Sequence, residues 1–257
     1  MVIDTLSLLL ELLPARFGVT MLMRTVPGHG IARLGKSILV VDLDPQGQDA
    51  TAFGISPEPG AFNILVSPDH LSAQSLSIWI RHAGRENLDL IPGNTSTSTA
   101  QTVMNSESRP ISFIRERLKP LVTGYHFVII DTAPSVGGIQ ERAVWAADLV
   151  IIPTATESMS LDGVRQMSET LRLLAGERSW RGGLLGVLPA FYDEKTRESQ
   201  AAMTELRSTF GDLVLAPIHR ATILRECAAE GLTIFEKGPD SRAAQEYLEL
   251  VSTVLKF

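Results

Sequence analysis

Three aspartates stand at the ends of two apolar runs and could hold a metal ion beside phosphates. Asp42 and Asp44 follow the aliphatic run Ile38–Val41, and Asp131 follows the run Phe127–Ile130. Both runs are typical of buried strands, and the carboxyl ends of parallel strands are where open α/β sheets bind ligands. Carboxylates at such positions hold Mg²⁺, often through its water shell, next to phosphate groups. The sequence therefore predicts a nucleotide-binding α/β protein.

The turn after the first run allows two interpretations of its aspartates. Asp44 stands directly before Pro45, and a proline disfavours helical backbone for the residue before it, so the Asp44 carboxylate is left at the sheet edge. Either aspartate could instead cap the following turn or helix through its side chain. We expect capping for Asp42 and a functional role for Asp44, because the second strand repeats the arrangement with Asp131.

A phosphate-loop pattern also occurs, but in an unsuitable context. The segment GIARLGKS satisfies G-x-x-x-x-G-K-[ST] through Gly30, Gly35, Lys36 and Ser37. A working loop needs a strand before it and a helix after it, so that amides at the helix N-terminus face the phosphates. Here the lysine and the serine lead straight into the first apolar run. We expect a glycine-bearing turn that feeds a strand, and cofactor binding by these four residues is the less favoured alternative.

Apolar runs alternate with helical patterns, which predicts a doubly wound, mainly parallel α/β sheet with helices on both faces. Strands are expected at Gly18–Met23, Ser37–Leu43, Leu88–Ile91, His126–Ile130, Asp148–Pro153, Leu184–Ala190 and Leu213–Ile218. Helices are expected at Ser75–His82, Ile111–Leu118, Ile139–Ala147, Leu161–Leu174, Glu198–Phe210 and Ser241–Leu255. The polar stretch Asn94–Ser108 is expected to form a surface loop. No linker or repeat divides the chain, so residues 1–257 are expected to form a single domain.

Composition limits the class of protein without assigning a function. The 257 residues suffice for a buried core, and 44% hydrophobic with 20% charged residues is ordinary for a soluble globular protein. A net charge of −6 argues against nucleic-acid binding through overall charge and leaves room only for a local basic patch. The single cysteine, Cys227, excludes an internal disulfide framework. The apolar run Met1–Leu13 contains Asp4 and Glu11 and is too short to span a bilayer, so we expect a packed helix and no membrane association.

Positive charge in the last third of the chain has two interpretations. Lys195, Arg220 and Arg225 could form a patch for DNA phosphates if the segments that carry them are neighbours. Acidic residues close by in the sequence, among them Glu194 and Glu226, could equally leave these side chains as balanced surface charges. The sequence does not separate the two interpretations.

Five segments, in order, resemble the ParA/Soj-type partition ATPases, a family of deviant Walker A P-loop proteins. ARLGKSILVVDLDPQGQDATAFGI (residues 32–55) is similar to the second strand and following turn of that family, and YHFVIIDTAPSVG (125–137) to its Walker B segment. The likeness continues in ENLDLIPGN (86–94), AADLVIIPTATESMSLDGV (146–164) and GPDSRAAQEY (238–247). The resemblance covers residues 32–257, and its DLDPQG element is fairly specific.

The resemblance implies roles for individual residues and implies ATP and Mg²⁺ as cofactors. Asp44 would orient the attacking water, and Asp131 would bind magnesium through water. The residues expected to contact the nucleotide are Pro45, Gln46, Pro217, His219 and Arg220. The residues expected to contact DNA are Lys195, Arg220 and Arg225.

The resemblance also implies partners and a location. The family binds DNA without sequence specificity, forms an ATP-sandwiched dimer and works with a centromere-binding ParB-like protein. A cytoplasmic location is expected, at the nucleoid if DNA binding holds. The final residues TVLKF lack a basic amphipathic tail, so no membrane partner is expected.

Residues 1–31 depart from the family pattern. FGVTMLMRTVPGHGI has no counterpart of the signature lysine, the phosphate-cradling glycines or the magnesium-binding Thr or Ser, and His29 is no substitute because an ordinary histidine is mostly neutral at pH 7. Three interpretations stay open: a non-catalytic interaction module that pairs with an intact paralogue, the product of a frameshifted or mis-started gene, or nucleotide binding through an unfamiliar segment. Partitioning of plasmid or chromosome DNA is the predicted function, and ATP hydrolysis is left undecided. A metabolic P-loop ligase or synthetase is less favoured, because no further acid–base constellation is present.

Overall fold

An eight-stranded sheet organises the described part of the chain. The computed structural model describes residues 16–20, 26–68, 72–133, 138–156 and 160–257. The strands are β1 (Arg16–Thr20), β2 (Ile38–Asp42), β3 (Arg81–Arg85), β4 (Leu88–Ile91), β5 (Phe127–Asp131), β6 (Leu149–Ala155), β7 (Gly183–Tyr192) and β8 (Ile218–His219). Their order is β3-β4-β2-β5-β1-β6-β7-β8, and every neighbouring pair is parallel except the edge pair β3 and β4.

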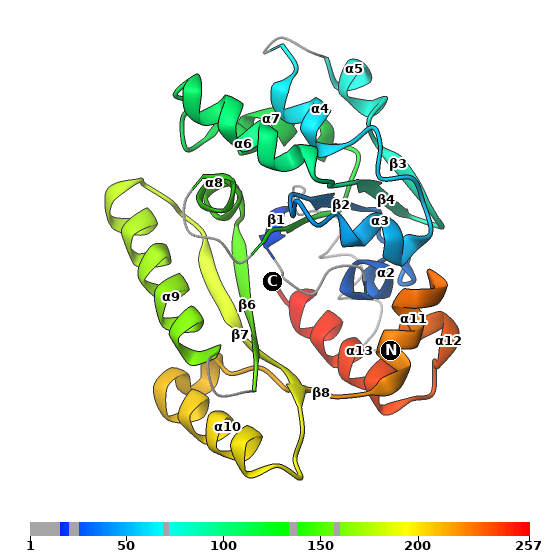
Figure 1. Cartoon of the computed structure of the whole chain (residues 1–257), viewed down its shortest axis with the longest axis vertical. Helices are drawn as coiled ribbons and strands as arrows, with labels where there is room; N and C mark the ends of the chain where they lie inside the picture. The colour runs from blue at the N-terminus through cyan, green and yellow to red at the C-terminus, as the bar shows by residue number, and fades with distance from the viewer. Residues whose placement is uncertain (1–15, 21–25, 69–71, 134–137, 157–159) are drawn as a thin grey trace, which may run out of the picture.

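Helices connect the strands and cover both faces of the sheet (Figure 1). They are α2 (Val26–Ala32), α3 (Gln48–Phe53), α4 (Ala61–Val66), α5 (Ala73–Ser77), α6 (Ser96–Ser106), α7 (Phe113–Val122), α8 (Ile139–Ala146), α9 (Ser160–Glu177), α10 (Arg197–Phe210), the 3-10 helix η1 (Gly211–Leu213), α11 (Thr222–Glu230), α12 (Ile234–Lys237) and α13 (Arg242–Val254). Among the helices in these ranges, none combines the length and the apolar character needed to cross a bilayer.

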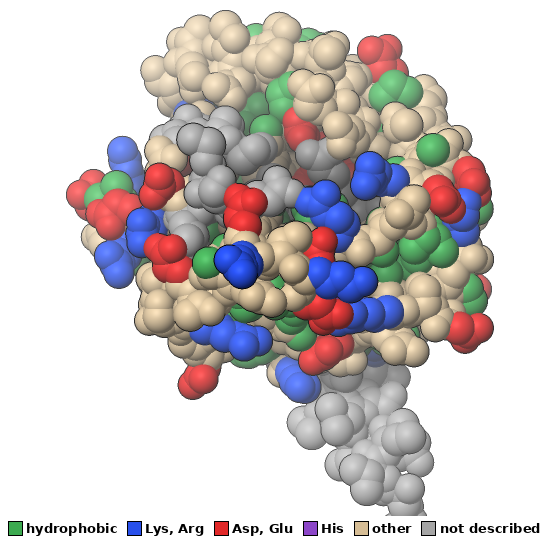
Figure 2. All heavy atoms as spheres, turned by 60° about the horizontal axis from the view of Figure 1, so that its bottom comes forward, with side chains coloured by type: hydrophobic (Ala, Val, Ile, Leu, Met, Phe, Trp, Pro, Cys, Tyr) green, Lys and Arg blue, Asp and Glu red, His purple; other side chains and the backbone are tan. Residues whose placement is uncertain are grey.

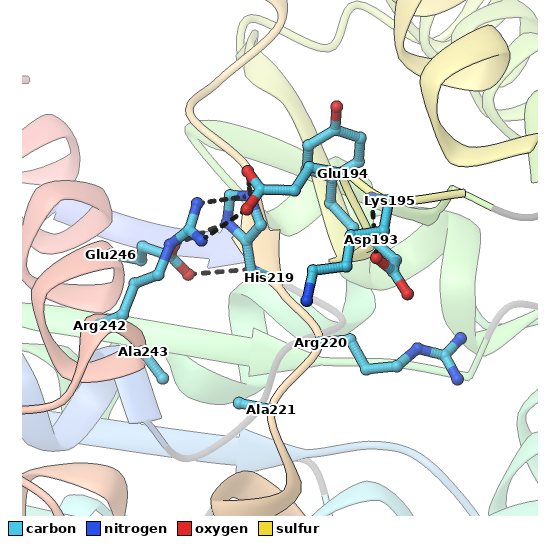
Figure 3. A pocket seen from close by; sticks show the side chains of 10 residues that line it. Asp193, Glu194, Lys195, His219, Arg220, Ala221, Arg242, Ala243 and Glu246 are labelled. Atoms are coloured by element: carbon cyan, nitrogen blue, oxygen red, sulfur yellow. Dashed lines mark hydrogen bonds and ion pairs between the residues drawn. The ribbon is translucent and has the colours of Figure 1, made fainter. Parts of the chain in front are cut away.

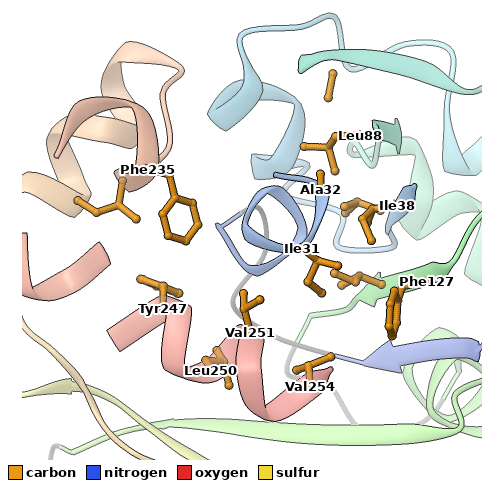
Figure 4. Packing of buried hydrophobic residues seen from close by; sticks show 14 of the residues in the cluster. Ile31, Ala32, Ile38, Leu88, Phe127, Phe235, Tyr247, Leu250, Val251 and Val254 are labelled. Atoms are coloured by element: carbon orange, nitrogen blue, oxygen red, sulfur yellow. The ribbon is translucent and has the colours of Figure 1, made fainter. Parts of the chain in front are cut away.

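The central strands alternate between two hydrophobic cores. In β2, Ile38 and Val40 pack with residues of α2, α3, α11, α12 and α13, whereas Leu39 and Val41 pack with residues of α4 to α8. Strand β5 divides its apolar residues between the same two cores. Every residue of both strands is buried, as expected for strands covered on two faces. Figure 4 shows the first core, where α2 lies between the sheet and α13.

The predicted fold class, a doubly wound and mainly parallel sheet, is confirmed. Six predicted strands overlap β1, β2, β4, β5, β6 and β7. The seventh, at Leu213–Ile218, is mostly wrong, because Leu213 ends the 3-10 helix and β8 begins only at Ile218. The predicted N-terminal helix at Met1–Leu13 lies outside the described residues.

Two further predictions on the secondary structure are wrong. The stretch Asn94–Ser108 contains a helix, α6, whose Thr97, Ala100 and Met104 are fully buried at helical spacing. The predicted helix Ser75–His82 ends at Ser77, and the chain then enters the antiparallel edge strand β3.

Candidate functional site

Asp42 and Asp131 close two adjacent central strands at the same edge of the sheet. They are the last residues of β2 and β5, they are register partners, and neither is exposed to solvent. Because side chains alternate along a strand, each carboxylate points to the face that Ile38, Val40 and Ile129 share with α2 and α3. Two carboxylates are therefore held side by side beneath the helices of one face.

The turn after β2 is built from hydrogen bonds to its aspartates. The Asp44 amide donates to Asp42 Oδ1 at 2.9 Å, and the Asp49 amide donates to Asp42 Oδ2 at 3.4 Å. The expected capping role of Asp42 is thus confirmed. Asp44 is itself 2% exposed, and its Oδ1 accepts the Gln46 amide at 2.8 Å. Within the same turn, Pro45 is half-buried and Gln46 is exposed.

Asp49 is a third buried aspartate beside Asp42 and Asp131, and it was not predicted from the sequence. It lies in the first turn of α3 and is fully buried. One carboxylate oxygen from each of Asp42, Asp49 and Asp131 lies within 4.8 Å of the other two. The sequence pattern of a buried strand followed by an aspartate cannot reveal such a residue, because Asp49 follows a turn.

A pocket lies at the same end of the sheet as the aspartates, where the parallel strands end, but several strands away from β2 and β5. It has a volume of about 310 Å³, and its wall includes Tyr192, Lys195, His219, Arg220 and Arg242. Strand β7, which ends in Tyr192, is three strands from β5. At about 4.8 Å per strand, the pocket is roughly 15 Å from the paired aspartates. Only an extended ligand could occupy both places.

One wall of this pocket is an ion-pair network centred on His219 (Figure 3). The two oxygens of Glu246 accept from the His219 backbone amide at 2.8 Å and from His219 Nδ1 at 2.7 Å. Arg242 approaches His219 Nε2 at 2.7 Å, and since arginine only donates, Nε2 is the acceptor. Arg242 also donates to Glu246 Oε1 at 2.8 Å and to Glu194 Oε1 at 3.3 Å. The hydrogen bond from Arg242 lowers the pKa of Glu194 below its usual value.

The remaining nucleotide and DNA candidates have different surroundings. Pro217 is half-buried directly before β8. Lys195 and Arg220 are exposed at the pocket, and the Arg220 side chain extends away from the His219 network (Figure 3). Arg225 is exposed on α11, outside the residues that line the pocket.

The GIARLGKS segment leads into the amino-terminal end of β2, whereas the aspartates lie at its carboxyl-terminal end. Gly30 belongs to the last turn of α2, and Gly35 follows that helix in left-handed backbone with a φ of 77°. Lys36 and Ser37 precede β2, and Ser37 Oγ is 2.7 Å from Nδ1 of His126, which precedes β5. The pattern is therefore a turn that feeds a strand, and no helix follows it. This geometry contradicts the alternative of a phosphate loop at Gly30, Gly35, Lys36 and Ser37.

Comparisons with known proteins identify the lineage. The chain is 32% identical over 232 residues to the sporulation initiation inhibitor protein Soj of Bacillus subtilis, covering 88% of this chain and 89% of the relative. The chain belongs to the ParA/Soj-type family. It is also 31% identical over 226 residues to the chromosome-partitioning ATPase Soj of Thermus thermophilus, covering 88% of this chain and 86% of the relative. A family model described as an AAA domain matches residues 25–179.

Solved structures agree with the fold of this ParA/Soj-type chain. Apo McdA from Cyanothece superposes with a TM-score of 0.79 at 20% identity, covering 93% of this chain and 97% of that chain. Cobyrinic acid a,c-diamide synthase from Mycobacterium smegmatis, solved with a bound ATP analog and magnesium, gives a TM-score of 0.79 at 23% identity, covering 94% of each chain. At these identities the likeness concerns the fold alone.

The donors at the aspartate edge fit a magnesium ion, the metal implied by the family. Mg²⁺ and Ca²⁺ prefer carboxylate oxygens, and Asp42, Asp49 and Asp131 offer three within 4.8 Å. Once bound, such an ion would supply positive charge beside phosphates. A glycine-rich phosphate cradle fits less well, because residues 21–25, which connect β1 to α2, have the sequence MLMRT without glycine or lysine. Those five residues lie outside the described part of the chain.

Proposed function

We propose that this chain acts in chromosome partitioning as a ParA-like protein that switches with bound magnesium and nucleotide. One observation carries the proposal: in a chain 32% identical to Soj, Asp131 ends β5 and Asp44 lies in the turn directly after the adjacent strand β2. In this assignment Asp131 holds magnesium through water and Asp44 orients the attacking water. The aspartate edge and the pocket at β7 and β8 would receive the two ends of one extended ligand, with phosphates at the acidic end and the base at the pocket.

The nucleotide contacts in this proposal come from residues at the pocket and from residues in the turn that follows β2. His219 and Arg220 lie on the pocket wall, and Pro217 precedes them. Pro45 and Gln46 form the turn that follows β2. Each ring nitrogen of His219 already has a partner, since Nδ1 contacts Glu246 and Nε2 contacts Arg242. This histidine would therefore form part of the pocket wall and would not donate a hydrogen bond to a base.

Calorimetry with Mg-ATP tests the proposal. We expect the purified chain to bind Mg-ATP, and we expect Asp131→Ala to weaken that binding strongly because a carboxylate at the metal is lost. Asp212→Ala, at an exposed aspartate in the 3-10 helix, is the matched control and should bind normally. No binding at millimolar ATP would overturn the nucleotide switch and favour a non-catalytic interaction module.

Hydrolysis is tested by Asp44→Ala. If Asp44 orients water, the substitution should lower kcat by orders of magnitude and spare ATP binding. Equal rates of ATP hydrolysis by the wild-type protein and by Asp44→Ala would show that Asp44 does not orient the attacking water.

DNA binding is a further part of the proposal and concerns Lys195, Arg220 and Arg225. Figure 2 views the molecule with the bottom of Figure 1 turned forward. On this face, lysine and arginine side chains are interspersed with acidic side chains. With a net charge of −6, binding should depend on a few phosphate contacts and weaken steeply with salt. Gel shifts should show each alanine variant at these three positions weakened, with a salt dependence that is shallower by about 1 per lost contact. Arg172→Ala, at an exposed arginine on α9, is the control.

The proposal also includes a second copy of this chain and a ParB-like partner. We expect sedimentation to show a nucleotide-dependent dimer, and a DNA-bound dimer would locate the protein at the nucleoid. A sedimentation coefficient that does not change with nucleotide would contradict the dimer.

A further inference from the structure

Two large apolar side chains are exposed at the amino-terminal end of the sheet, the opposite end of the strands from the candidate site. Leu34 is 56% exposed in the turn between α2 and β2, and Phe257 is 46% exposed after α13. Leu255 is half-buried between α13 and Phe257 and packs against the first core. Leu34, Leu255 and Phe257 form what we call the amino-end patch. We propose that this patch is the docking surface for residues 1–13 of the same chain, which lie outside the described part.

Helices α2 and α13 run in the same direction across the sheet. Strands β1 and β2 are both parallel to β5, so α2, which connects them, leads from the carboxyl end of the sheet back to its amino end. Helix α13 begins at the carboxyl end, where Arg242 and Glu246 contact His219 at the end of β8. Its 13 residues span about 20 Å, and Val254 at its last turn belongs to the same core as Phe127, the first residue of β5 (Figure 4). Both helices therefore end at the amino end of the sheet.

This shared direction places Leu34 close to Leu255. A Cβ on Gly30 in α2 would lie 2.7 Å from Val251 in α13, so the two helices touch at these positions. Leu34 and Leu255 each follow four residues later, about one helical turn further on. Phe257 comes two residues after Leu255. The amino-end patch is thus one surface, made where two touching helices end.

The charges around the patch complement those of residues 1–13. The charged residues within two positions of Leu34 or Phe257 are all basic, namely Arg33, Lys36 and Lys256. Residues 1–13, MVIDTLSLLLELL, contain Asp4 and Glu11 and no lysine, arginine or histidine. Single exposed apolar side chains are ordinary on protein surfaces, but an apolar patch flanked by cations suits a leucine-rich acidic segment in both hydrophobic and electrostatic terms.

The segment joins the fold at the same end of the molecule. Strand β1 begins at Arg16, which pairs with Phe127 at the amino end of β5. Only residues 14 and 15 separate the segment from Arg16, so residue 13 is within roughly 11 Å of β1. A link this short gives the segment an effective concentration at the patch of about millimolar or more. Docking within one chain is therefore favoured over docking of a separate molecule.

Hydrogen exchange of the nucleotide-free full chain, measured by mass spectrometry of its peptides, tests this inference. We expect the backbone amides of residues 1–13 to exchange slowly in the wild-type chain. Leu34→Glu should make these amides exchange about tenfold faster or more and should lower the Tm by about 2 °C or more, because a charge on the patch disfavours an apolar occupant. Phe257→Glu, at the other exposed member of the patch, should have the same effect. Ile78→Glu, at a side chain that is 65% exposed between α5 and β3, is the matched control and should leave both measurements unchanged.

Four outcomes would overturn the inference, and none of them bears on the proposed function. Fast exchange of residues 1–13 in the wild-type chain would exclude docking. Slow exchange that neither patch variant changes would show that the segment packs elsewhere. Slow exchange that is lost on dilution, together with a dimer in sedimentation, would make a second copy of the chain the occupant. Slow exchange that appears only with vesicles of phosphatidylserine and phosphatidylcholine would show that the segment binds a membrane and not the patch.

Discussion

Asp42 and Asp131 are register partners on the adjacent parallel strands β2 and β5, and each is the last residue of its strand. The backbone continues the pairing one residue further, since the Leu43 amide donates to the Asp131 carbonyl at 2.8 Å. The two carboxylates are thus fixed relative to each other by the sheet itself. Any ion or water bound between them would meet a rigid pair of ligands.

Replacing Asp42 tests its part in the turn. Asp42→Ala removes the acceptor of the Asp44 and Asp49 amides, whereas Asp42→Asn keeps one oxygen for the Asp44 amide. We expect the alanine variant to have an unfolding free energy about 1–2 kcal/mol below that of the asparagine variant, because buried amides lose their acceptor. Urea unfolding measures the difference, and equal stabilities would show that the turn forms without this side chain.

The paired strand ends could be predicted from sequence because burial on two faces leaves a simple pattern. Ile38–Val41 and Phe127–Ile130 are apolar at consecutive positions, and an aspartate ends each run. Asp49 carries no such pattern. The turn that leads to it packs against the loop after β4 at Gly47 and Gly93, where a Cβ on either glycine would clash with backbone oxygens. That contact joins residues far apart in the chain, and a single sequence does not show it.

Helix α6 and strand β3 were missed for related reasons. In α6 the buried face consists of Thr97, Ala100 and Met104, so polar composition conceals a helical spacing. In β3 only Ala83 is buried, because an antiparallel edge strand has little apolar surface to cover. Composition predicts elements well where they are buried on two faces and poorly where one small face is buried.

The His219 network gives a second stability test. The Glu246 side chain is 12% exposed and accepts from His219 and from Arg242 at 2.7–2.8 Å. Glu246→Ala should lower the unfolding free energy by about 2 kcal/mol, since it leaves these donors without their charged acceptor. Glu249→Ala, at an exposed glutamate on the same helix, is the matched control and should change stability little. Equal effects of the two substitutions in urea unfolding would contradict this account.

Close packing of α2 against α12 and α13 predicts a cost for any side chain at Gly30. A Cβ there would lie 2.7 Å from Val251 and 3.0 Å from Phe235. Gly30→Ala should therefore lower the unfolding free energy by about 1–3 kcal/mol. Gly163 in α9 meets no atom within 4 Å, so Gly163→Ala should raise stability by about 0.5–1 kcal/mol through helix propensity. Thermal unfolding of the two variants should shift in opposite directions, and a stabilised Gly30→Ala would show that α2 is not packed in this way.

His29 makes the attachment of α2 sensitive to acid. Its side chain is buried in α2, and Nδ1 lies 2.7 Å from Thr233 Oγ1 at the start of α12. Burial lowers the pKa of His29, against an opposing effect of Glu236, and Arg85 and Arg33 act in the same direction as burial. In the unfolded chain this histidine takes up a proton near its ordinary pKa of about 6.5.

Protonation of His29 is less favourable in the native state than in the unfolded state. The unfolded state therefore binds more protons at pH values between the native and the unfolded pKa. The unfolding free energy should therefore fall as the pH drops below about 6.5, and this contribution should be complete below the lowered native pKa. His29→Gln should remove this part of the acid sensitivity, whereas His82→Gln, at a side chain that is 66% exposed, should keep it. Urea unfolding between pH 7.5 and pH 5 measures the three slopes. A slope for His29→Gln as steep as that of the wild type would show that buried carboxylates, and not this histidine, set the acid sensitivity.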